Sequence, residues 1–187
     1  MYAATTLTQS TTEEKATPTV TWANPAPITY GTALSETQLD ATASVAGTFK
    51  YTPAAGKVLA AGTQTLSVKF TPTSKDYSSV TQTATLVVNH ASTTTTITSI
   101  SPSNPTAGTK VVVYFTVSNG TTSYPTGKVT VSDNAGDTAC SATLSNAVAS
   151  CKITLKTAGP VTLTATYPGD ANDTGSSGTY ALTVQPE

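Results

Sequence analysis

The sequence repeats itself with an offset of 75 positions, and this repeat limits the size of the folding unit. Tyr2–Ala4 aligns with Tyr77–Ser79, and the same offset places Glu14–Thr17 over Asn89–Ser92 without a gap. A chain made of tandem copies folds as a series of small units, each of which contacts its neighbours. We therefore expect two units of roughly 75 and 95 residues, each large enough for a modest core.

The repeat also predicts the domain boundaries. Residues 1–15 resemble the last strand of a preceding copy, residues 16–90 form the first unit, and residues 91–187 form the second. An orphaned strand frays unless it pairs with something. It pairs either with its own chain or with a neighbouring copy, and the second case would build a filament by strand addition.

Composition indicates an all-β protein that does not bind nucleic acid. The chain has 43 Thr, no Arg, nine Lys, ten acidic residues and one His, and neither sign of charge clusters. Threonine is β-branched and suits a half-exposed strand. Without a basic patch, the surface has no electrostatic hold on nucleic acid or on anionic lipid. No apolar run reaches the length that crosses a bilayer, so no membrane insertion is expected in this fragment.

Alternating apolar residues predict strands at short spacing. One example is Val161–Tyr167, where every second side chain is apolar and the threonines between them face the other way. The strands expected in the first unit cover residues 19–22, 38–43, 48–52, 66–70 and 84–88, and those in the second cover 94–100, 110–117, 127–132, 139–144, 149–155, 161–167 and 179–184. Strand counts of this kind are typical of two tandem immunoglobulin-like β-sandwich domains.

The two cysteines predict a disulfide. Cys140 and Cys151 are symmetric about Ser145–Asn146, and in an antiparallel hairpin closed by those two residues they would face each other at a distance that suits a bridge. A bridge implies an oxidising compartment, outside the cell or at its surface. The alternative is a pair of unrelated buried thiols.

Sequence motifs in the first unit resemble the MBG-type repeats of bacterial surface proteins. The resemblance rests on four segments, Trp22–Ser35, Gln38–Ala41, Gly47–Pro53 and Leu66–Pro72.

The second unit resembles the bacterial Ig-like repeat of the Big_3 type. Its motifs are Pro125–Val131, Ala158–Gly159 and Ala165–Asp170, and it departs from that pattern at Asn146–Ala147, where Asn-Gly is common. Both resemblances imply secreted or cell-surface multidomain proteins in which the units serve as stalk or adhesive modules. Neither implies catalytic residues or a cofactor.

The sequence offers no constellation for catalysis. His90 is the single imidazole and lies in the join between the units, where a solvated linker residue is the simpler interpretation. The carboxylates of Glu36, Asp40 and Asp76 are scattered among turns, and no Gly-x-Ser-x-Gly elbow is present. We therefore expect a protein that is not an enzyme and needs no cofactor.

A weak calcium candidate is the loop that contains Asp170, Asn172 and Asp173, with Asp133 or Asp137 as a possible addition. Calcium takes six to eight hard oxygen ligands, and alternating Asp and Asn side chains supply some of them. The alternative is that these residues form an ordinary turn and hydrogen-bond their own backbone.

Aromatic residues of the first unit are weak candidates for a binding platform. Trp22, Tyr30, Tyr51 and Tyr77 offer flat apolar faces with a polar edge, as in sugar-binding sites, and Trp22, Tyr30 and Tyr77 are the candidates for binding. The alternative is that they form the core of a unit that is poor in Phe, Leu and Ile.

Together these patterns predict a non-enzymatic stalk or adhesive module of an extracellular tandem-repeat protein. Its expected partners are neighbouring repeats or other copies of the chain, with surface glycans or proteins as further possibilities. Two alternatives remain open at this point: a carbohydrate- or partner-binding module, and a subunit of a strand-exchanged filament.

Overall fold

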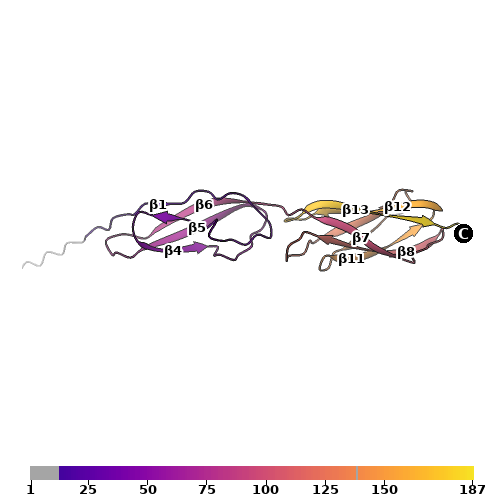
Figure 1. The fold of residues 1–187 in the computed structure, drawn as a ribbon, viewed down its shortest axis with the longest axis horizontal. Helices are drawn as coiled ribbons and strands as arrows, with labels where there is room; N and C mark the ends of the chain where they lie inside the picture. The colour runs from indigo at the N-terminus through magenta and orange to yellow at the C-terminus, as the bar shows by residue number, and fades with distance from the viewer. Residues whose placement is uncertain (1–12, 138) are drawn as a thin grey trace, which may run out of the picture. The chain divides into compact units, whose positions relative to one another are not determined.

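The computed structural model describes residues 13–137 and 139–187, and every regular element in those ranges is a β-strand. Figure 1 shows the strands along the chain. The predicted all-β fold class is confirmed. Within the same ranges, no helix has the length and hydrophobicity needed to cross a membrane. Of the expected N-terminal strand, residues 1–12 lie outside the described residues, and Glu13–Lys15 are not in a strand.

The chain separates into two compact units. The N-terminal unit contains Leu34–Lys57 and Thr65–Leu86, together with the described residues before Pro27. The C-terminal unit contains Val87–Glu187, and the segments Pro27–Ala33 and Val58–Gln64 are grouped with it.

From Glu13 onward, the N-terminal half of the chain holds six strands in two sheets. A four-stranded sheet has the order β2-β6-β5-β4, and β1 and β3 form a separate pair. The bounds are β1 (Val20–Thr21), β2 (Ile28–Thr29), β3 (Thr42–Ala43), β4 (Gly47–Thr52), β5 (Gly62–Pro72) and β6 (Val80–Asn89).

The core of this half comes from the alternation seen in the sequence. Leu66, Val68 and Phe70 of β5 are fully buried, and Leu86 and Val88 of β6 are at most 2% exposed. Because side chains alternate across a strand, the residues between them face solvent or the rim. The strands expected over residues 66–70 and 84–88 are present, within β5 and β6.

One strand prediction for this half was too long, and one strand was not predicted at all. The strand expected over residues 38–43 is reduced to β3, because the Gln38 side-chain oxygen accepts hydrogen bonds from the Ser35 N–H and hydroxyl and closes a turn there. The pairing of β2 was missed. Ile28 and Thr29 align in parallel with Val88 and Asn89, and a strand of two residues leaves no periodic signal.

The C-terminal half forms a sandwich of two sheets with the orders β10-β9-β12-β13 and β11-β8-β7. All seven expected strands of this half are present, with ends shifted by a few residues. Their bounds are β7 (Thr94–Ser101), β8 (Thr109–Ser118), β9 (Lys128–Asp133), β10 (Ala139–Thr143), β11 (Val148–Leu155), β12 (Gly159–Gly169) and β13 (Thr174–Val184).

Inward side chains from both sheets fill one core. The largest are Tyr167, Phe115, Ile153, Leu155 and Leu163, each at most 1% exposed. Tyr167 also anchors the end of β12, because its hydroxyl donates a 2.8 Å hydrogen bond to the Thr126 carbonyl just before β9. The buried ring therefore has its polar group satisfied.

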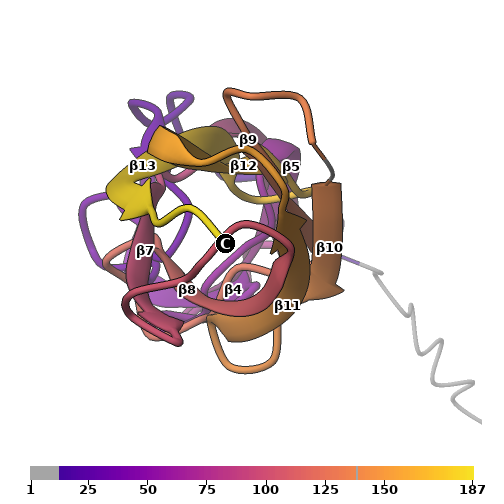
Figure 2. The same cartoon turned by 90° about the vertical axis from the view of Figure 1, so that its right-hand side faces the viewer.

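The two open sides of the sandwich are closed by edge strands. On one side β10 lies beside β11, and on the other β13 lies beside β7 (Figure 2). Hydroxyls join the second pair: the Thr95 and Ser176 oxygens are 2.7 Å apart, and the Thr93 hydroxyl donates to the Thr174 carbonyl at 2.7 Å. Gly178 lies at the same contact, and an added Cβ there would overlap the backbone carbonyl of Thr95.

Candidate functional site

Cys140 and Cys151 form a disulfide that joins the two sheets of the C-terminal sandwich. Cys140 lies in β10 and Cys151 in β11, and each strand is the edge of its own sheet. Their Cα atoms are 5.8 Å apart. The bridge therefore fastens one open side of the sandwich.

The predicted hairpin geometry of this bridge was wrong. β10 pairs with β9 and β11 pairs with β8, so the two cysteines do not face each other within one ladder. The turn is also displaced by one residue, because the Val148 N–H donates to the Ser145 carbonyl and leaves Asn146 and Ala147 as the central residues. Sequence symmetry placed the cysteines close together correctly, but it could not show that the chain changes sheets between them.

The turn predicts a stabilising substitution. Asn146 and Ala147 have φ angles of 49° and 70°, a left-handed conformation that costs alanine about 1–2 kcal/mol and glycine very little. We expect Ala147→Gly to raise the free energy of unfolding by about 0.5–1 kcal/mol, after allowance for the greater unfolded-state entropy of glycine. Urea unfolding followed by circular dichroism measures this change.

Ala139→Gly is the matched control for this substitution. Ala139 is exposed in β10 and is not among the residues with positive φ. Ala139 begins β10 and pairs with Ser132 of β9, and glycine loses more backbone entropy there than alanine does, so this variant should lose stability. Equal effects of the two substitutions would contradict the role assigned to the turn.

The loop of the calcium candidate is held together by the Asp170 carboxylate. Its Oδ2 accepts hydrogen bonds from the Thr126 hydroxyl and N–H at 2.6 and 2.9 Å, and its Oδ1 accepts from the N–H groups of Asn172 and Asp173 at 2.8 and 2.9 Å. Each oxygen already has two donors. Asp170 therefore stabilises its own turn and also holds the loop that contains Thr126.

The rest of the loop is tied to the start of the C-terminal unit. The Asn172 carbonyl accepts from the Ala91 N–H at 2.9 Å, and the Thr174 N–H donates to the Ala91 carbonyl at 2.8 Å. Asp173 is 3% exposed, and its Oδ1 accepts a 2.8 Å hydrogen bond from the Asn119 side-chain amide. Sequence reasoning missed Thr126 and Asn119 as partners because both are more than 40 residues away.

Asp133 and Asp137 do not join this loop. Asp133 ends β9, whereas the Asp170 partner Thr126 precedes that strand, and six strand residues span roughly 20 Å. The Asp137 carboxylate instead accepts from the N–H groups of Lys156 and Thr157. In the described part of the chain, no group of three or more His, Cys, Asp or Glu side chains comes together to hold a metal ion.

The hydrogen bonds of Asp170 change its titration. Burial by itself would raise the pKa of Asp170, but the bonds from Thr126, Asn172 and Asp173 outweigh it and lower the pKa to about 2. For Asp173 burial is the largest effect and raises the pKa, the hydrogen bond from Asn119 opposes it, and the negative charge of Asp170 adds to it.

These shifts predict how stability depends on pH. Because the folded pKa of Asp170 lies below the unfolded value, its ionised form stabilises the fold above about pH 4, and this contribution is lost as the pH falls toward 2. The opposite shift of Asp173 offsets part of this loss. We expect wild type to lose about 1 kcal/mol more than Asp170→Asn between pH 4 and pH 2, a value reduced because Asp170 is partly exposed to solvent. Urea unfolding at several pH values measures the difference, and parallel curves for the two proteins would contradict the assignment.

The aromatic candidates differ in burial, and Trp22 is the most buried of them. Trp22 is 7% exposed, its indole N–H donates to the Gln38 carbonyl at 3.1 Å, and its ring packs edge-on against Tyr51. Tyr30 and Tyr77 are half-buried. Trp22 is therefore a core residue of the N-terminal unit, which agrees with the alternative that the aromatic rings form the core.

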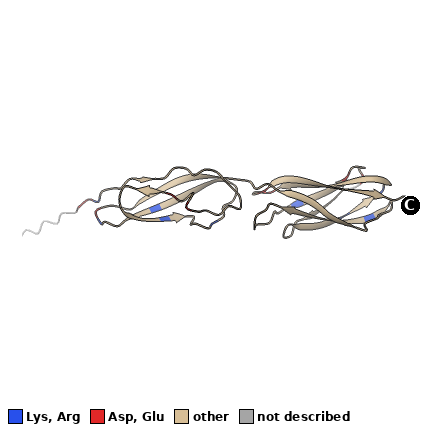
Figure 3. Ribbon diagram, in the orientation of Figure 1, with Lys and Arg blue, Asp and Glu red and all other residues tan. Residues whose placement is uncertain are grey.

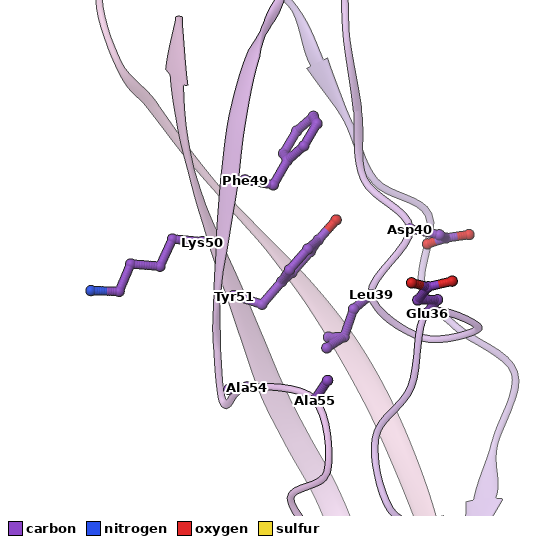
Figure 4. Close-up of a pocket in the computed structure, with 8 residues that line it drawn as sticks. All are labelled: Glu36, Leu39, Asp40, Phe49, Lys50, Tyr51, Ala54 and Ala55. Carbon is purple, nitrogen blue, oxygen red and sulfur yellow. The ribbon is translucent and has the colours of Figure 1, made fainter.

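A pocket of about 670 Å³ lies beside β4 in the N-terminal unit. Figure 4 shows the rings of Phe49 and Tyr51 extending from β4 toward the segment that carries Glu36, Leu39 and Asp40. The two rings stack with centroids 6.3 Å apart and planes 20° apart. Sequence reasoning had described Glu36 and Asp40 as scattered, and it did not consider Phe49. The structure brings all of them to one pocket.

Charges elsewhere are sparse in both units (Figure 3). His90 is exposed and lies after β6, outside the pocket. The lining of the pocket therefore includes carboxylates and aromatic rings but does not include His90.

Comparisons with known proteins identify the family of the C-terminal unit. Residues 92–185 match the family described as the bacterial Ig-like domain, group 3. The match does not extend to residues 16–90, so the resemblance of that segment to MBG-type repeats stays a prediction. No curated protein sequence matches the chain.

Two solved structures show similarity to the chain. The fibronectin(III)-like modules of CbhA from Clostridium thermocellum are 14% identical, with a TM-score of 0.38, and the alignment covers 90% of this chain and 95% of that one. The immunoglobulin domains 1–5 of Sidekick-1 are 12% identical, with a TM-score of 0.36, over 91% of this chain and 40% of that one. The family match, which spans the whole seven-stranded sandwich, shows that this chain belongs to the bacterial Ig-like domains of group 3.

Proposed function

We propose that this chain is a non-enzymatic structural and adhesive module of a bacterial protein outside the cell. The observation that carries the proposal is the disulfide between the edge strands β10 and β11. A bridge of this kind persists in oxidising compartments. It also fastens the side of the sandwich where the edge strands β10 and β11 of the two sheets lie next to each other.

The polar side chains of the C-terminal unit support the same proposal. Asp170, Asp137 and Asn134 all accept hydrogen bonds from backbone N–H groups of other segments, so they brace loops. The repeat of 75 positions supports a tandem array. Partners of the module are neighbouring repeats or other copies of the chain.

Pulling on single molecules tests the mechanical role. With the chain held between handles at its two ends, a load-bearing module unfolds in discrete steps. The disulfide prevents the segment between the two cysteines, which are 11 positions apart, from extending under force. Reduction should therefore increase the unfolding extension of the C-terminal unit by roughly 30 Å. Smooth extension without steps would contradict the proposal, and identical step lengths before and after reduction would show that the bridge does not bear load.

A further inference from the structure

The pocket beside β4 has one apolar aromatic wall. Phe49 and Tyr51 are two residues apart in the strand, so they emerge on the same face, and Leu39 of the opposite segment is 8% exposed. Phe49 also packs against Phe70 and Tyr51 against Trp22, but both side chains remain only half-buried and line the pocket. The pocket volume of about 670 Å³ lies in the range of small-ligand sites.

The opposite wall carries negative charge. Glu36 and Asp40 line the pocket from the segment that faces β4. Lys50 also contributes to the lining, but it lies between Phe49 and Tyr51 in the strand, and Figure 4 shows its side chain extending in the other direction. The ionised side chains on the aromatic side of the pocket are therefore two carboxylates.

The Tyr51 hydroxyl ties the aromatic wall to the segment that carries Asp40. The hydroxyl accepts a 2.9 Å hydrogen bond from the Ala41 N–H. Burial raises the pKa of Tyr51, that hydrogen bond opposes the shift, and the charge of Asp40 adds to it. The hydroxyl is therefore hydrogen-bonded to the residue that directly follows Asp40 in the chain.

We propose that this pocket binds an alkylammonium group, of the kind carried by a lysine side chain, with its aliphatic stem against Phe49, Tyr51 and Leu39 and its charged head toward Glu36 and Asp40. Such a ligand buries methylene groups on apolar surface while the cation remains near polar groups. An ammonium group also gains from the face of an aromatic ring within about 6 Å of its centroid. A neutral ligand of the same shape satisfies the aromatic wall but leaves the two carboxylates without a counter-charge. This site is independent of the mechanical role proposed above.

Titration of the full chain with small probes, followed by NMR of the Phe49 and Tyr51 ring signals, tests the proposal. We expect N-acetyl-lysine amide to cause saturable shifts. N-acetyl-norleucine amide, which has a similar stem and no charge, should bind about five-fold more weakly or worse. The peptide acetyl-Gly-Lys-Gly-amide and 1,5-diaminopentane then distinguish a protein source of the ammonium from a free amine, because the better of the two identifies the source. Equal binding of the norleucine probe, preferential binding of cellobiose, or no saturable shift with N-acetyl-lysine amide would overturn the proposal.

Variants separate the charge from the pocket shape. Glu36→Gln combined with Asp40→Asn keeps the side-chain volumes and should weaken the lysine probe about five-fold or more while leaving the norleucine probe unchanged. Glu13→Gln combined with Glu14→Gln is the matched control, because these two exposed carboxylates belong to the same unit and do not line this pocket, and it should not weaken binding. Circular dichroism and Trp22 fluorescence establish that each variant is folded. Unchanged affinity for the lysine probe in the double variant would also overturn the proposal.

Discussion

Gly178→Ala should destabilise the C-terminal unit by about 3 kcal/mol or more. A Cβ at this position would overlap the carbonyl oxygen of Thr95 and lie 2.9 Å from its carbonyl carbon. Both atoms belong to the backbone of β7, so no side chain can rotate away, and the two edge strands must separate. Overpacking that forces backbone to move costs about 1–3 kcal/mol or more. The separation would also weaken the nearby bond between Thr95 and Ser176.

Urea unfolding followed by circular dichroism measures this loss. The chain has one tryptophan, and Trp22 lies in the N-terminal unit, so its fluorescence serves as an internal reference that should not change. Thr179→Ala is the matched control, because Thr179 is the exposed neighbour of Gly178 and its substitution should cost less than about 0.5 kcal/mol. If Gly178→Ala and Thr179→Ala unfold at the same urea concentration, the close approach of β13 to β7 is wrong.

Removal of the disulfide should cost up to about 3 kcal/mol. A disulfide stabilises a fold by lowering the chain entropy of the unfolded state. For two cysteines 11 positions apart this stabilisation is close to that value, and it increases with the length of the enclosed loop. Cys140→Ala combined with Cys151→Ala is preferable to serine, because Cys151 is 8% exposed and a buried hydroxyl without a partner adds a separate penalty. The loss should appear in circular dichroism and not in Trp22 fluorescence.

Reduction of the wild-type protein is the control for this pair of substitutions. Dithiothreitol breaks the bridge without changing a side chain other than the two thiols, so it should lower the stability by a similar amount. The same reagent should have no effect on the double variant. If reduced wild type melts at the same temperature as oxidised wild type, the bridge does not stabilise the fold, and the structural role assigned to it is refuted.

The sequence by itself determined the class of the fold and the positions of its long strands. Alternation at Leu66, Val68 and Phe70, and again along Val161–Tyr167, appeared in the structure as the buried faces of β5 and β12. This was possible because the in-and-out period of a strand is a local property. Strands of two residues, such as β2, carry no such period and were missed.

Only the tertiary structure decided which distant segments meet. The segment from Cys140 to Cys151 contains a turn in either interpretation. Only the pairing of β10 with β9 and of β11 with β8 shows that the bridge crosses between sheets. The Asp170 loop is a similar case. An aspartate can serve in a turn or as a calcium ligand, and only the position of Thr126 beside its carboxylate shows which role Asp170 has. The pocket was hidden for the same reason, since Glu36 and Phe49 meet only after the chain has folded back. Pairing between segments depends on the summed packing of the whole unit, and no local pattern encodes that sum.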